Sequence, residues 1–387
     1  MVLDEEETVL LNMAIRKIKV LHFVVDDKFI DGEMDAFDGD GRFFNEYVLV
    51  VDSKDYQISK INKSEKIKLI YSYRKAREIL KQGDYDVVFF VSLLNYHIIN
   101  SVPDNKIVIW WAFGYDIYGP NRFIDIPLFK PLTNHYVNSF SLTTRIKSFL
   151  KKSPFLLNII QGNKDIAIRK IHYFQPPIPF EYKLMQKYDG FTAKQFYYPK
   201  SHYYSYLNGE LPCHNHDIIV GNSATETNNH LDVWARIQPF VPNSSRVIFP
   251  INYGHLKYAD YLEKTIGGKT PNAVFLKNFL PKEEYLNLIG SSGYAVYGVL
   301  REQAMGGINR CLANGVKLFL YRDSIPFKYL KELGCVVFAI EDIDDSSFNT
   351  PLSIEQAQIN RRCLNKDSDY VNKITEDSIA EIQRLLE

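Results

Sequence analysis

The sequence predicts an α/β fold in which two doubly wound, Rossmann-like domains face each other across a cleft. Short apolar runs rich in β-branched and aromatic residues recur along the chain, as is typical of parallel strands buried on both faces, and stretches of helical length separate them. The 387 residues also suffice for two domains of about 150 residues, each with its own core.

The first half contains four expected strands and one clear crossover helix. Residues 74–83 (RKAREILKQG) form the expected helix, which ends at Gly83 because glycine commonly stops helices. The expected strands are residues 18–25 (IKVLHFVV), 47–51 (YVLVV), 86–91 (DVVFFV) and 106–113 (KIVIWWAF). Together these elements predict a parallel sheet for the first domain.

The second half repeats this alternation more regularly. Pro281 opens one expected helix, and Ser324 is the expected N-cap of another that stops at Gly334. A third expected helix, residues 308–314, follows a glycine pair and stops at Gly315. The expected strands are residues 217–221 (DIIVG), 246–251 (RVIFPI), 273–277 (AVFLK), 294–300 (YAVYGVL), 316–321 (VKLFLY) and 335–340 (CVVFAI).

A polar, turn-rich segment near residues 200–215 separates the two halves. We therefore expect an N-terminal domain over residues 1–210 and a C-terminal domain over residues 211–352. Residues 353–387 are expected to form C-terminal helices that could pack back on the first domain.

Composition excludes several classes of protein. With 46 Lys and Arg against 46 Asp and Glu the net charge is zero, which argues against a general nucleic-acid binder. The spacing of the four cysteines and nine histidines argues against a disulfide scaffold, and we expect no metal site and no cofactor. Asp342 and Asp344 imitate a metal–diphosphate motif, but their acidic loop favours a solvated turn. The acidic start and the lack of a long apolar run predict neither a signal peptide nor a membrane-spanning helix.

Two glycine-containing loops are candidate phosphate-binding sites, since each directly follows an expected strand. Gly221, Asn222 and Ser223 form the first, where small residues let backbone N–H groups approach a phosphate. Gly306 and Gly307 form the second, before a helix whose dipole favours a diphosphate. The alternatives are an ordinary turn at the first loop and close helix–sheet packing at the glycine pair.

Aromatic and acidic residues at other strand ends are candidate substrate contacts. Tyr253 and His255 could contact a base or a sugar, or belong to an ordinary turn. Asp116 lies among aromatic residues, where burial raises a carboxyl pKa, so it could act as a general base; alternatively it caps the next helix. Asp26 and Asp27 form a similar but weaker pair after the first strand.

A local charge bias is hidden by the neutral total. Residues 130–174 carry eight basic side chains and one acidic side chain, interleaved with apolar residues. This pattern is typical of a peripheral contact with anionic lipid, which we assign to Lys147, Lys151, Lys152 and Phe155. The alternative is a solvated helix face with an ordinary buried stripe.

Segments of both halves resemble the TDP-N-acetylfucosamine:lipid II N-acetylfucosaminyltransferase family, which includes proteins labelled 4-alpha-L-fucosyltransferases. The similar segments are residues 218–230 (IIVGNSATETNNH), 247–254 (VIFPINYG) and 279–320, together with 110–118 (WWAFGYDIY), which is similar to the family's Trp-Gly-x-Asp-Leu-Tyr segment. The most specific matches are Gly221, Asn222, Ser223, Asn228, His230, Gln303 and Gly306. The chain departs from the family at Glu302, where an uncharged residue is expected, and at Ala112 and Phe113.

The resemblance implies a GT-B fold and a metal-independent glycosyltransferase. The implied donor is a TDP- or UDP-linked amino-deoxy sugar of the N-acetylfucosamine type, bound by the second domain. The implied acceptor is an undecaprenyl-diphosphate-linked saccharide, bound by the first domain. Such an enzyme would act in bacterial surface polysaccharide synthesis as a peripheral protein at the cytoplasmic face of the inner membrane.

The resemblance also implies residue roles. N–H groups around Ser223, Gly306 and Gly307 would hold the diphosphate, and Tyr253 with Phe279 or Leu280 would hold the base. The full set of expected donor contacts is Gly221, Asn222, Ser223, Asn228, His230, Tyr253, Leu280, Gln303, Gly306, Gly307 and Asn309. Glu302 and Gln303 would contact the sugar, with Glu302 a catalytic candidate. If the reaction inverts configuration, Asp116, or failing it Asp26, would accept the hydroxyl proton of the acceptor.

Two other functions remain open from the sequence. A nucleotide-sugar 2-epimerase also pairs two such domains and would need no lipid-linked acceptor. A non-catalytic nucleotide-sugar or glycan-binding protein would keep the glycine loops and would be insensitive to loss of the Asp116 carboxylate.

Overall fold

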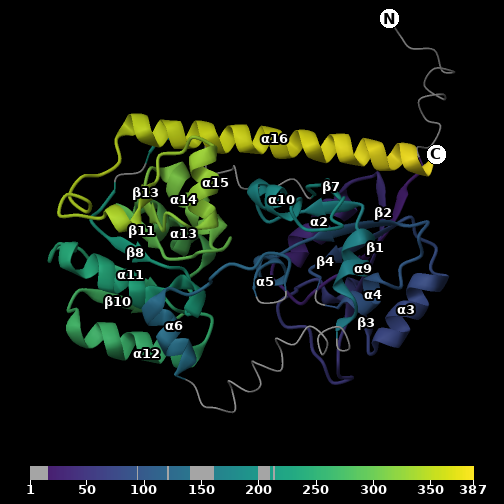
Figure 1. The fold of residues 1–387 in the computed structure, drawn as a ribbon, viewed down its shortest axis with the longest axis horizontal. Coiled ribbons are helices and arrows are strands. Elements are labelled where there is room, and N and C mark those ends of the chain that lie inside the picture. The colour runs from purple at the N-terminus through teal and green to yellow at the C-terminus, as the bar shows by residue number, and fades with distance from the viewer. Residues whose placement is uncertain (1–15, 94, 120–121, 140–160, 199–209, 212–213) are drawn as a thin grey trace, which may run out of the picture. The chain divides into compact units, whose positions relative to one another are not determined.

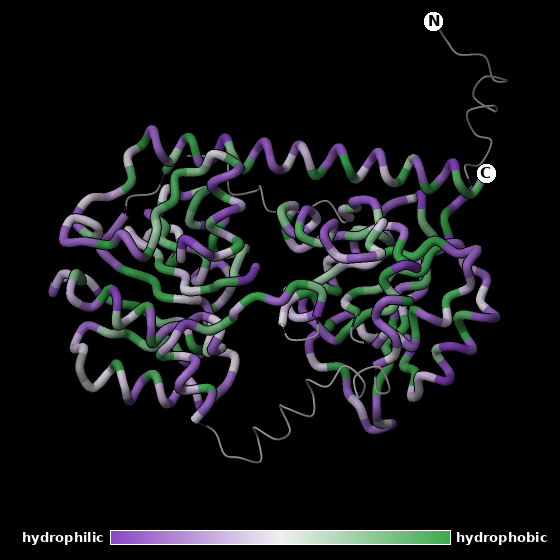
Figure 2. The backbone as a smooth tube through the Cα atoms, in the orientation of Figure 1, coloured by the Kyte–Doolittle hydropathy of each residue, from purple (hydrophilic) through white to green (hydrophobic). Residues whose placement is uncertain are grey.

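The computed structural model describes residues 16–93, 95–119, 122–139, 161–198, 210–211 and 214–387, which form two compact units (Figure 1). Unit 1 draws on the ranges Met1–Asp116, Ser153–Lys200 and Asn372–Glu387, and unit 2 on Ile117–Lys152 and Ser201–Val371. Hydrophobic strands lie inside each unit, and polar residues dominate the outer helices (Figure 2). Each unit therefore has its own core.

Unit 1 contains a seven-stranded sheet in the order β3-β2-β1-β4-β5-β6-β7, in which every described strand pair is parallel. Its strands are β1 (Ile18–Phe23), β2 (Phe43–Val50), β3 (Ile67–Ile70), β4 (Val87–Val91), β5 (Ile107–Trp111), β6 (Tyr173–Gln175) and β7 (Lys194–Gln195). Its helices are α2 (Ile30–Gly39), α3 (Tyr73–Gln82), α4 (Tyr96–Ile99), α5 (Gly114–Ile117, whose last residue falls in unit 2), α9 (Lys164–Arg169) and α10 (Pro179–Met185), with a 3₁₀ turn at Ser64–Lys66. The chain order of the strands reverses between β1 and β4, so the two loops that follow these strands diverge there.

Unit 2 contains a six-stranded parallel sheet in the order β10-β9-β8-β11-β12-β13. Its strands are β8 (Ile218–Val220), β9 (Val247–Pro250), β10 (Ala273–Leu276), β11 (Tyr294–Tyr297), β12 (Lys317–Leu320) and β13 (Phe338–Ala339). Its helices are α6 (Pro131–Asn138), α11 (His230–Ile237), α12 (Leu256–Ile266), α13 (Lys282–Ser291), α14 (Met305–Asn314) and α15 (Ile325–Glu332). Helices α11 and α12 cover one face of the sheet and α13, α14 and α15 the other (Figure 1).

Short 3₁₀ turns complete unit 2, at Glu226–Asn228, Gln238–Phe240, Gly267–Lys269 and Ile340–Asp342. As in unit 1, the strand order reverses at one point, here between β8 and β11. Loops that follow the carboxyl ends of strands at such a point diverge and leave room for a ligand.

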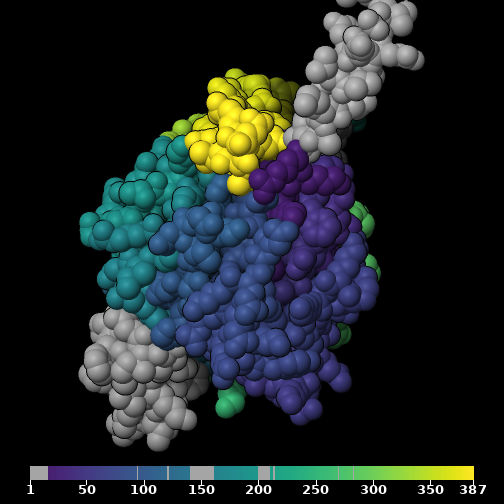
Figure 3. Space-filling model, turned by 90° about the vertical axis from the view of Figure 1, so that its right-hand side faces the viewer, coloured from purple at the N-terminus to yellow at the C-terminus, as the bar shows by residue number. Residues whose placement is uncertain are grey.

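The last helix, α16 (Ile354–Leu386), contributes to both units. In unit 1, Ile379 and Ile382 are buried in the core formed by β1, β4 and β5. The hydroxyl groups of Thr375 and Ser378 donate to the carbonyl oxygens of Tyr197 and Gln195, which ties the helix to β7 and the residues after it. Figure 3 shows this yellow end of α16 against the purple residues that open the described chain.

Residues 117–139 cluster with unit 2, although we expected residues 1–210 to form one domain. The cause is a set of contacts between α6 and α11. The Asp232 carboxylate accepts from the backbone N–H groups of Leu132 (2.8 Å) and Thr133 (2.9 Å), which caps the first turn of α6. Asn229 likewise accepts from the N–H group of Lys130 at 2.7 Å. Residues 372–387 cluster with unit 1.

Most expected strands are present, but three short strands of unit 1 were not predicted, namely β3, β6 and β7. The expected strand 335–340 was too long, because only Phe338–Ala339 pairs with β12. The expected helix 308–314 begins earlier, at Met305, so the glycine pair lies inside its first turn. Ser324 is the N-cap of α15 as predicted, and its hydroxyl oxygen accepts from the N–H group of Phe327 at 3.2 Å.

Candidate active site

The loop after β8 in unit 2 is built around a left-handed glycine and a buried histidine. Gly221 has a φ of +71°, and a Cβ atom there would lie 2.5 Å from Nε2 of His230 and 3.1 Å from Oδ1 of Asn228. His230 is completely buried, and neither of its ring nitrogens has a hydrogen-bond partner among the described residues. Burial lowers the pKa of His230 to about 3, because a charged imidazolium would lose its hydration. The ring is therefore neutral and packs directly under the loop.

Side chains from two further segments hold this loop. The Asn228 amide donates to the carbonyl oxygen of Ser223 (3.1 Å) and to the hydroxyl of Thr225 (2.9 Å). Its oxygen accepts from the N–H group of Asn222 at 3.2 Å. The Asn222 amide donates to the Tyr253 hydroxyl, beyond β9, at 2.8 Å. The five residues thus form one polar network at the carboxyl ends of β8 and β9.

The loop after β11 joins the same network through Gln303. Its amide donates to the Thr225 hydroxyl at 3.1 Å, and its oxygen accepts from the Thr227 hydroxyl at 2.6 Å. The two loops on either side of the strand-order reversal are therefore linked by side chains. Thr225 and Thr227 were not predicted to be part of the site; their position just after a strand and a glycine was the available signal.

Helix α14 starts inside this region with exposed backbone. Its N-cap, Ala304, is left-handed (φ +62°) and offers no side-chain acceptor to the first-turn N–H groups. Gly306 is exposed, and a Cβ atom there would meet nothing within 4 Å. At Gly307 a Cβ atom would lie 2.6 Å from the Tyr297 hydroxyl. Gly307 is thus required for packing, whereas Gly306 leaves the backbone open to approach by an anion.

An exposed aromatic pair borders the network. The rings of Tyr253 and Phe279 are stacked, with centroids 6.3 Å apart and an interplanar angle of 16°. Phe279 is 73% exposed and Tyr253 41%, so the stacked pair presents flat apolar ring surface beside the network. Leu280, the alternative base contact, is half-buried.

The other predicted donor contacts are less well defined by hydrogen bonds. Glu302 and Asn309 are half-buried, and the carbonyl oxygen of Glu302 accepts from the Arg301 guanidinium at 2.5 Å. Nδ1 of His255, beyond Tyr253, lies 2.5 Å from Oε2 of Glu226. The expected membrane-contact residues Lys147, Lys151, Lys152 and Phe155 lie outside the described residues.

In unit 1 the predicted base Asp116 is completely buried and surrounded by donors. One carboxylate oxygen accepts from the N–H group of Leu93 (2.7 Å) and the Trp110 indole (3.1 Å). The other oxygen accepts from the N–H group of Phe113 at 2.6 Å. Burial raises the pKa of Asp116 to about 6 in spite of these bonds. The sequence offered a helix cap as the alternative role, but Asp116 lies inside α5, and its hydrogen bonds join the loops after β4 and β5.

Asp26 is similarly engaged. Its carboxylate accepts from the Tyr56 hydroxyl (2.9 Å) and from the N–H groups of Ser59 (2.8 Å) and Lys60 (2.8 Å). Although partial burial opposes it, this set of donors lowers the pKa of Asp26. A carboxylate stabilised in this way is a weak proton acceptor, and it anchors the loop formed by residues 56–60.

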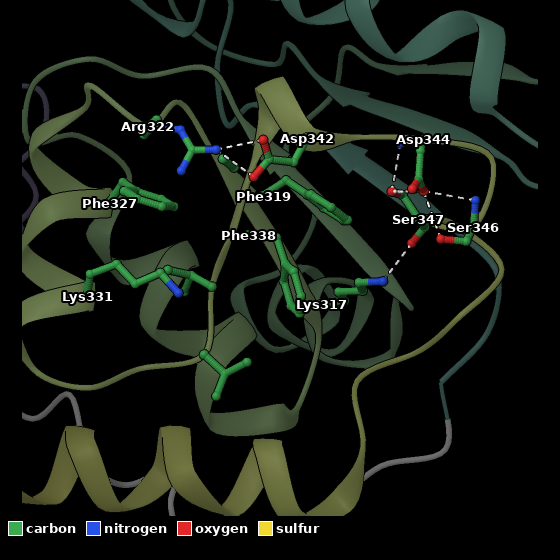
Figure 4. A pocket seen from close by; sticks show the side chains of 13 residues that line it. Lys317, Phe319, Arg322, Phe327, Lys331, Phe338, Asp342, Asp344, Ser346 and Ser347 are labelled. Carbon is green, nitrogen blue, oxygen red and sulfur yellow. Dashed lines mark hydrogen bonds and ion pairs between the residues drawn. The ribbon is translucent and has the colours of Figure 1, made fainter.

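A separate cavity of about 410 Å³ in unit 2 contains the Asp342 and Asp344 pair (Figure 4). Asp342 pairs with the Arg322 guanidinium at 2.6 Å, and Asp344 accepts from the hydroxyls of Ser346 (2.8 Å) and Ser347 (2.9 Å). Side chains of the protein therefore bind both carboxylates, as is usual in a surface turn. Within the described residues, no group of three His, Cys, Asp or Glu side chains is arranged to hold a metal ion.

Comparisons with known proteins agree with this architecture. The model of the family described as 4-alpha-L-fucosyltransferase, glycosyl transferase group 56, matches residues 177–367. An alpha-glucosyltransferase in complex with UDP and a 13-mer DNA is 12% identical, with a TM-score of 0.52 over 95% of this chain and 100% of that chain. An alpha,alpha-trehalose-phosphate synthase (UDP-forming) from Burkholderia vietnamiensis is 9% identical, with a TM-score of 0.58 over 95% and 100%.

A third structure, alpha,alpha-trehalose 6-phosphate synthase from Burkholderia multivorans, is 9% identical, with a TM-score of 0.57 over 96% of both chains. At such low identity these structures establish the fold alone, and they confirm the GT-B prediction. None of the described helices combines the length and apolar character needed to cross a membrane. The chain is a glycosyltransferase of the GT-B fold, and its residues 177–367 are similar to the 4-alpha-L-fucosyltransferase family, glycosyl transferase group 56.

Proposed function

We propose that this glycosyltransferase moves an amino-deoxy sugar of the N-acetylfucosamine type from a TDP- or UDP-sugar to an undecaprenyl-diphosphate-linked saccharide. The reaction would need no metal ion and would serve bacterial surface polysaccharide synthesis. The protein would act in the cytoplasm, held at the inner membrane surface by the basic and apolar residues between positions 130 and 174.

The observation that carries the donor site is the meeting of two loops at the strand-order reversal of unit 2. Gln303, beyond β11, bonds to Thr225 and Thr227, beyond β8, and Gly306 opens the first turn of α14 beside them. The N–H groups of that turn and the positive end of the helix dipole suit a diphosphate. As the bond from the sugar to the diphosphate breaks, these donors stabilise the charge that develops on the leaving group.

The remaining donor contacts follow from this placement of the diphosphate. The stacked Tyr253 and Phe279 rings provide an exposed flat surface for the nucleotide base. Gln303 and Glu302 would contact the transferred sugar, and Asn222 would fix the Tyr253 hydroxyl through its 2.8 Å hydrogen bond. The neutral His230 supports the loop by packing against it and contributes no charge to the site.

The test is a matched pair of glycine substitutions. Gly306→Ala places a methyl group in open space, so the variant should fold like the wild type, but the methyl group would obstruct an anion at the helix start. Gly268→Ala adds a methyl group in equally open space in a 3₁₀ turn outside the site. We expect thymidine diphosphate or uridine diphosphate, measured by calorimetry, to bind Gly306→Ala about tenfold more weakly and Gly268→Ala unchanged. Equal binding to both variants would contradict the proposed diphosphate site.

Turnover is tested with a panel of TDP- and UDP-sugars and an undecaprenyl-diphosphate-linked disaccharide. Transfer to the disaccharide, undiminished by a chelator, is the expected result. An isomerised donor would indicate a 2-epimerase, and nucleotide binding without turnover would indicate a binding protein. Activity restored only by magnesium or manganese would contradict the metal-free mechanism.

A further inference from the structure

The strand-order reversal of unit 1 brings three loops together at the carboxyl edge of its sheet. The reversal lies between β1 and β4, and β5 is the next strand along. The loop after β4 contains Ser92, whose φ of +67° is unusual for a residue with a side chain. Ser92 lies near Tyr115 and Asp116 of the loop after β5, and its buried hydroxyl has no hydrogen-bond partner among the described residues. Strained residues of this kind cluster at functional sites.

A row of stacked aromatic rings lines this edge. Phe29, beyond β1, stacks on Phe113 with centroids 6.2 Å apart and an interplanar angle of 27°. Phe113 stacks in turn on Tyr115 at 5.7 Å and 6°. Phe29 is 51% exposed and Tyr115 45%, so the row offers apolar ring surface where solvent would favour polar residues. We call Phe29, Phe113 and Tyr115 the aromatic row.

The carboxylate available beside the aromatic row is Asp27. Asp26 is held by the loop at residues 56–60, and Asp116 is buried beneath three N–H donors. Asp27 is half-buried, and its Oδ1 accepts from the N–H group of Phe29 at 3.3 Å. Asp27 interacts electrostatically with Tyr115, which places its carboxylate close to the row.

Aromatic rings beside a carboxylate match the chemistry of a sugar. The C–H face of a sugar ring packs on an aromatic ring, and its hydroxyl groups donate to carboxylate oxygens. A purely lipid ligand would leave the Asp27 charge unpaired against an apolar surface, which is unfavourable. Thus a saccharide uses both features of the edge, whereas a hydrocarbon chain uses one.

We propose that the aromatic row and Asp27 form the subsite for the acceptor saccharide, with the rings packing on its sugar face and Asp27 accepting a hydrogen bond from a hydroxyl group. This inference rests on the proposed function, because it assigns to unit 1 the acceptor of the transfer whose donor unit 2 binds. It places the recognition of the acceptor on the loops after β1 and β5.

The first experiment measures saccharide binding without turnover. Saturation-transfer NMR on the full chain uses N,N′-diacetylchitobiose, a disaccharide of N-acetylglucosamine, as the probe. We expect sugar signals from the wild type and their loss in Phe29→Ala and Tyr115→Ala. Phe44→Ala is the matched control, because Phe44 is 55% exposed but lies near the amino end of β2, whereas the aromatic row lies at the carboxyl ends of the strands. Absence of signal from the wild type, or signals that survive both substitutions, would overturn the subsite.

The second experiment separates acceptor binding from donor binding in the transfer assay with the undecaprenyl-diphosphate-linked disaccharide. We expect Phe29→Ala and Asp27→Asn to raise the acceptor KM about tenfold, equivalent to about 1.4 kcal/mol, with the affinity for thymidine diphosphate unchanged. Asp27→Glu should restore part of the acceptor affinity. Failure of the wild-type protein to bind thymidine diphosphate would count against the donor site. An unchanged acceptor KM in the variants, with intact nucleotide binding, would refute the subsite alone.

Discussion

Each unit contains its own parallel sheet, whose strand order reverses once, but the sheet edges at the two reversals differ in chemistry. In unit 2 the edge consists of amide and hydroxyl side chains, glycines and the open start of α14. In unit 1 it consists of stacked rings and carboxylates. The same topology therefore fixes where a ligand can bind, and the loops decide which kind of ligand it is.

Each edge also depends on one fully buried titratable residue, and the two residues are shifted in opposite senses. Burial raises the pKa of Asp116 in unit 1 to about 6, and it lowers the pKa of His230 in unit 2 to about 3. In both cases burial disfavours the charged form. The Asp116 carboxylate nevertheless accepts three N–H hydrogen bonds, whereas His230 forms none with the described residues. The comparison therefore predicts different losses of stability when the two residues are replaced.

The largest expected effect is the loss of Asp116. In Asp116→Ala the N–H groups of Leu93 and Phe113 and the Trp110 indole lose their acceptor inside the core. We expect unit 1 to be destabilised by about 4 kcal/mol, while unit 2 keeps its stability and its affinity for thymidine diphosphate. Hydrogen exchange followed by mass spectrometry reads the peptides of each unit separately. Equal loss of protection in both units would contradict this independence.

A smaller effect is expected at the matching position of unit 2. Gly221→Ala places a Cβ atom 2.5 Å from Nε2 of His230 in a left-handed backbone conformation. We expect a cost of about 2 kcal/mol and weaker nucleotide binding, since the loop must shift to relieve the clash. Thermal unfolding and calorimetry with thymidine diphosphate measure the two effects. Gly268→Ala is again the control, and normal nucleotide binding by Gly221→Ala would show that the loop is not needed for the donor.

The smallest effect, measured per pH unit, is the opposite pH dependence of the two edges. The folded-state pKa of Asp116 lies above its ordinary value of 3.8, so its contribution to stability is present below about pH 4 and lost as the pH rises through about 6. The folded-state pKa of His230 lies below 6.5, so its contribution is present above that pH and lost as the pH falls towards 3.

Asp116→Asn and His230→Gln isolate these contributions. Relative to the wild type, we expect the free energy of unfolding of Asp116→Asn to rise between pH 4 and 6, and that of His230→Gln to rise as the pH falls below 6.5, each by about 1 kcal/mol per pH unit. Urea unfolding at a series of pH values provides the measurement. Parallel curves for each variant and the wild type would show that neither residue titrates as described.

The sequence predicted the long buried strands well and the short edge strands poorly. Continuous apolar runs marked β1, β4 and β5, because strands covered on both faces need apolar residues throughout. Strands β6 and β7 contain three and two residues, too few for any periodic pattern. The segment after Cys335 had the composition of a strand, but pairing at the edge of the sheet is limited to two residues.

Among the predicted donor contacts, the sequence indicated which residues lie at strand ends but not how they are paired. Asn222, Asn228, Tyr253 and Gln303 do meet in one network, as expected for loops at a strand-order reversal. Thr227 was missed because its partner, Gln303, is far away in the sequence. Asp116 lies at the expected edge, but its burial among donors from the loop after β4 and from β5 and the loop after it is not revealed by any local pattern.

Neither unit is a continuous stretch of the chain, which matters for the design of truncated proteins. A stop codon placed after residue 371 would remove Ile379 and Ile382 from the core of unit 1, but it would leave all residues of unit 2 in place. A fragment that starts at residue 201 would likewise lack the α6 turns held by Asp232. Fragments of the two halves should therefore be designed by joining separated segments through short linkers, not by dividing the sequence at its midpoint.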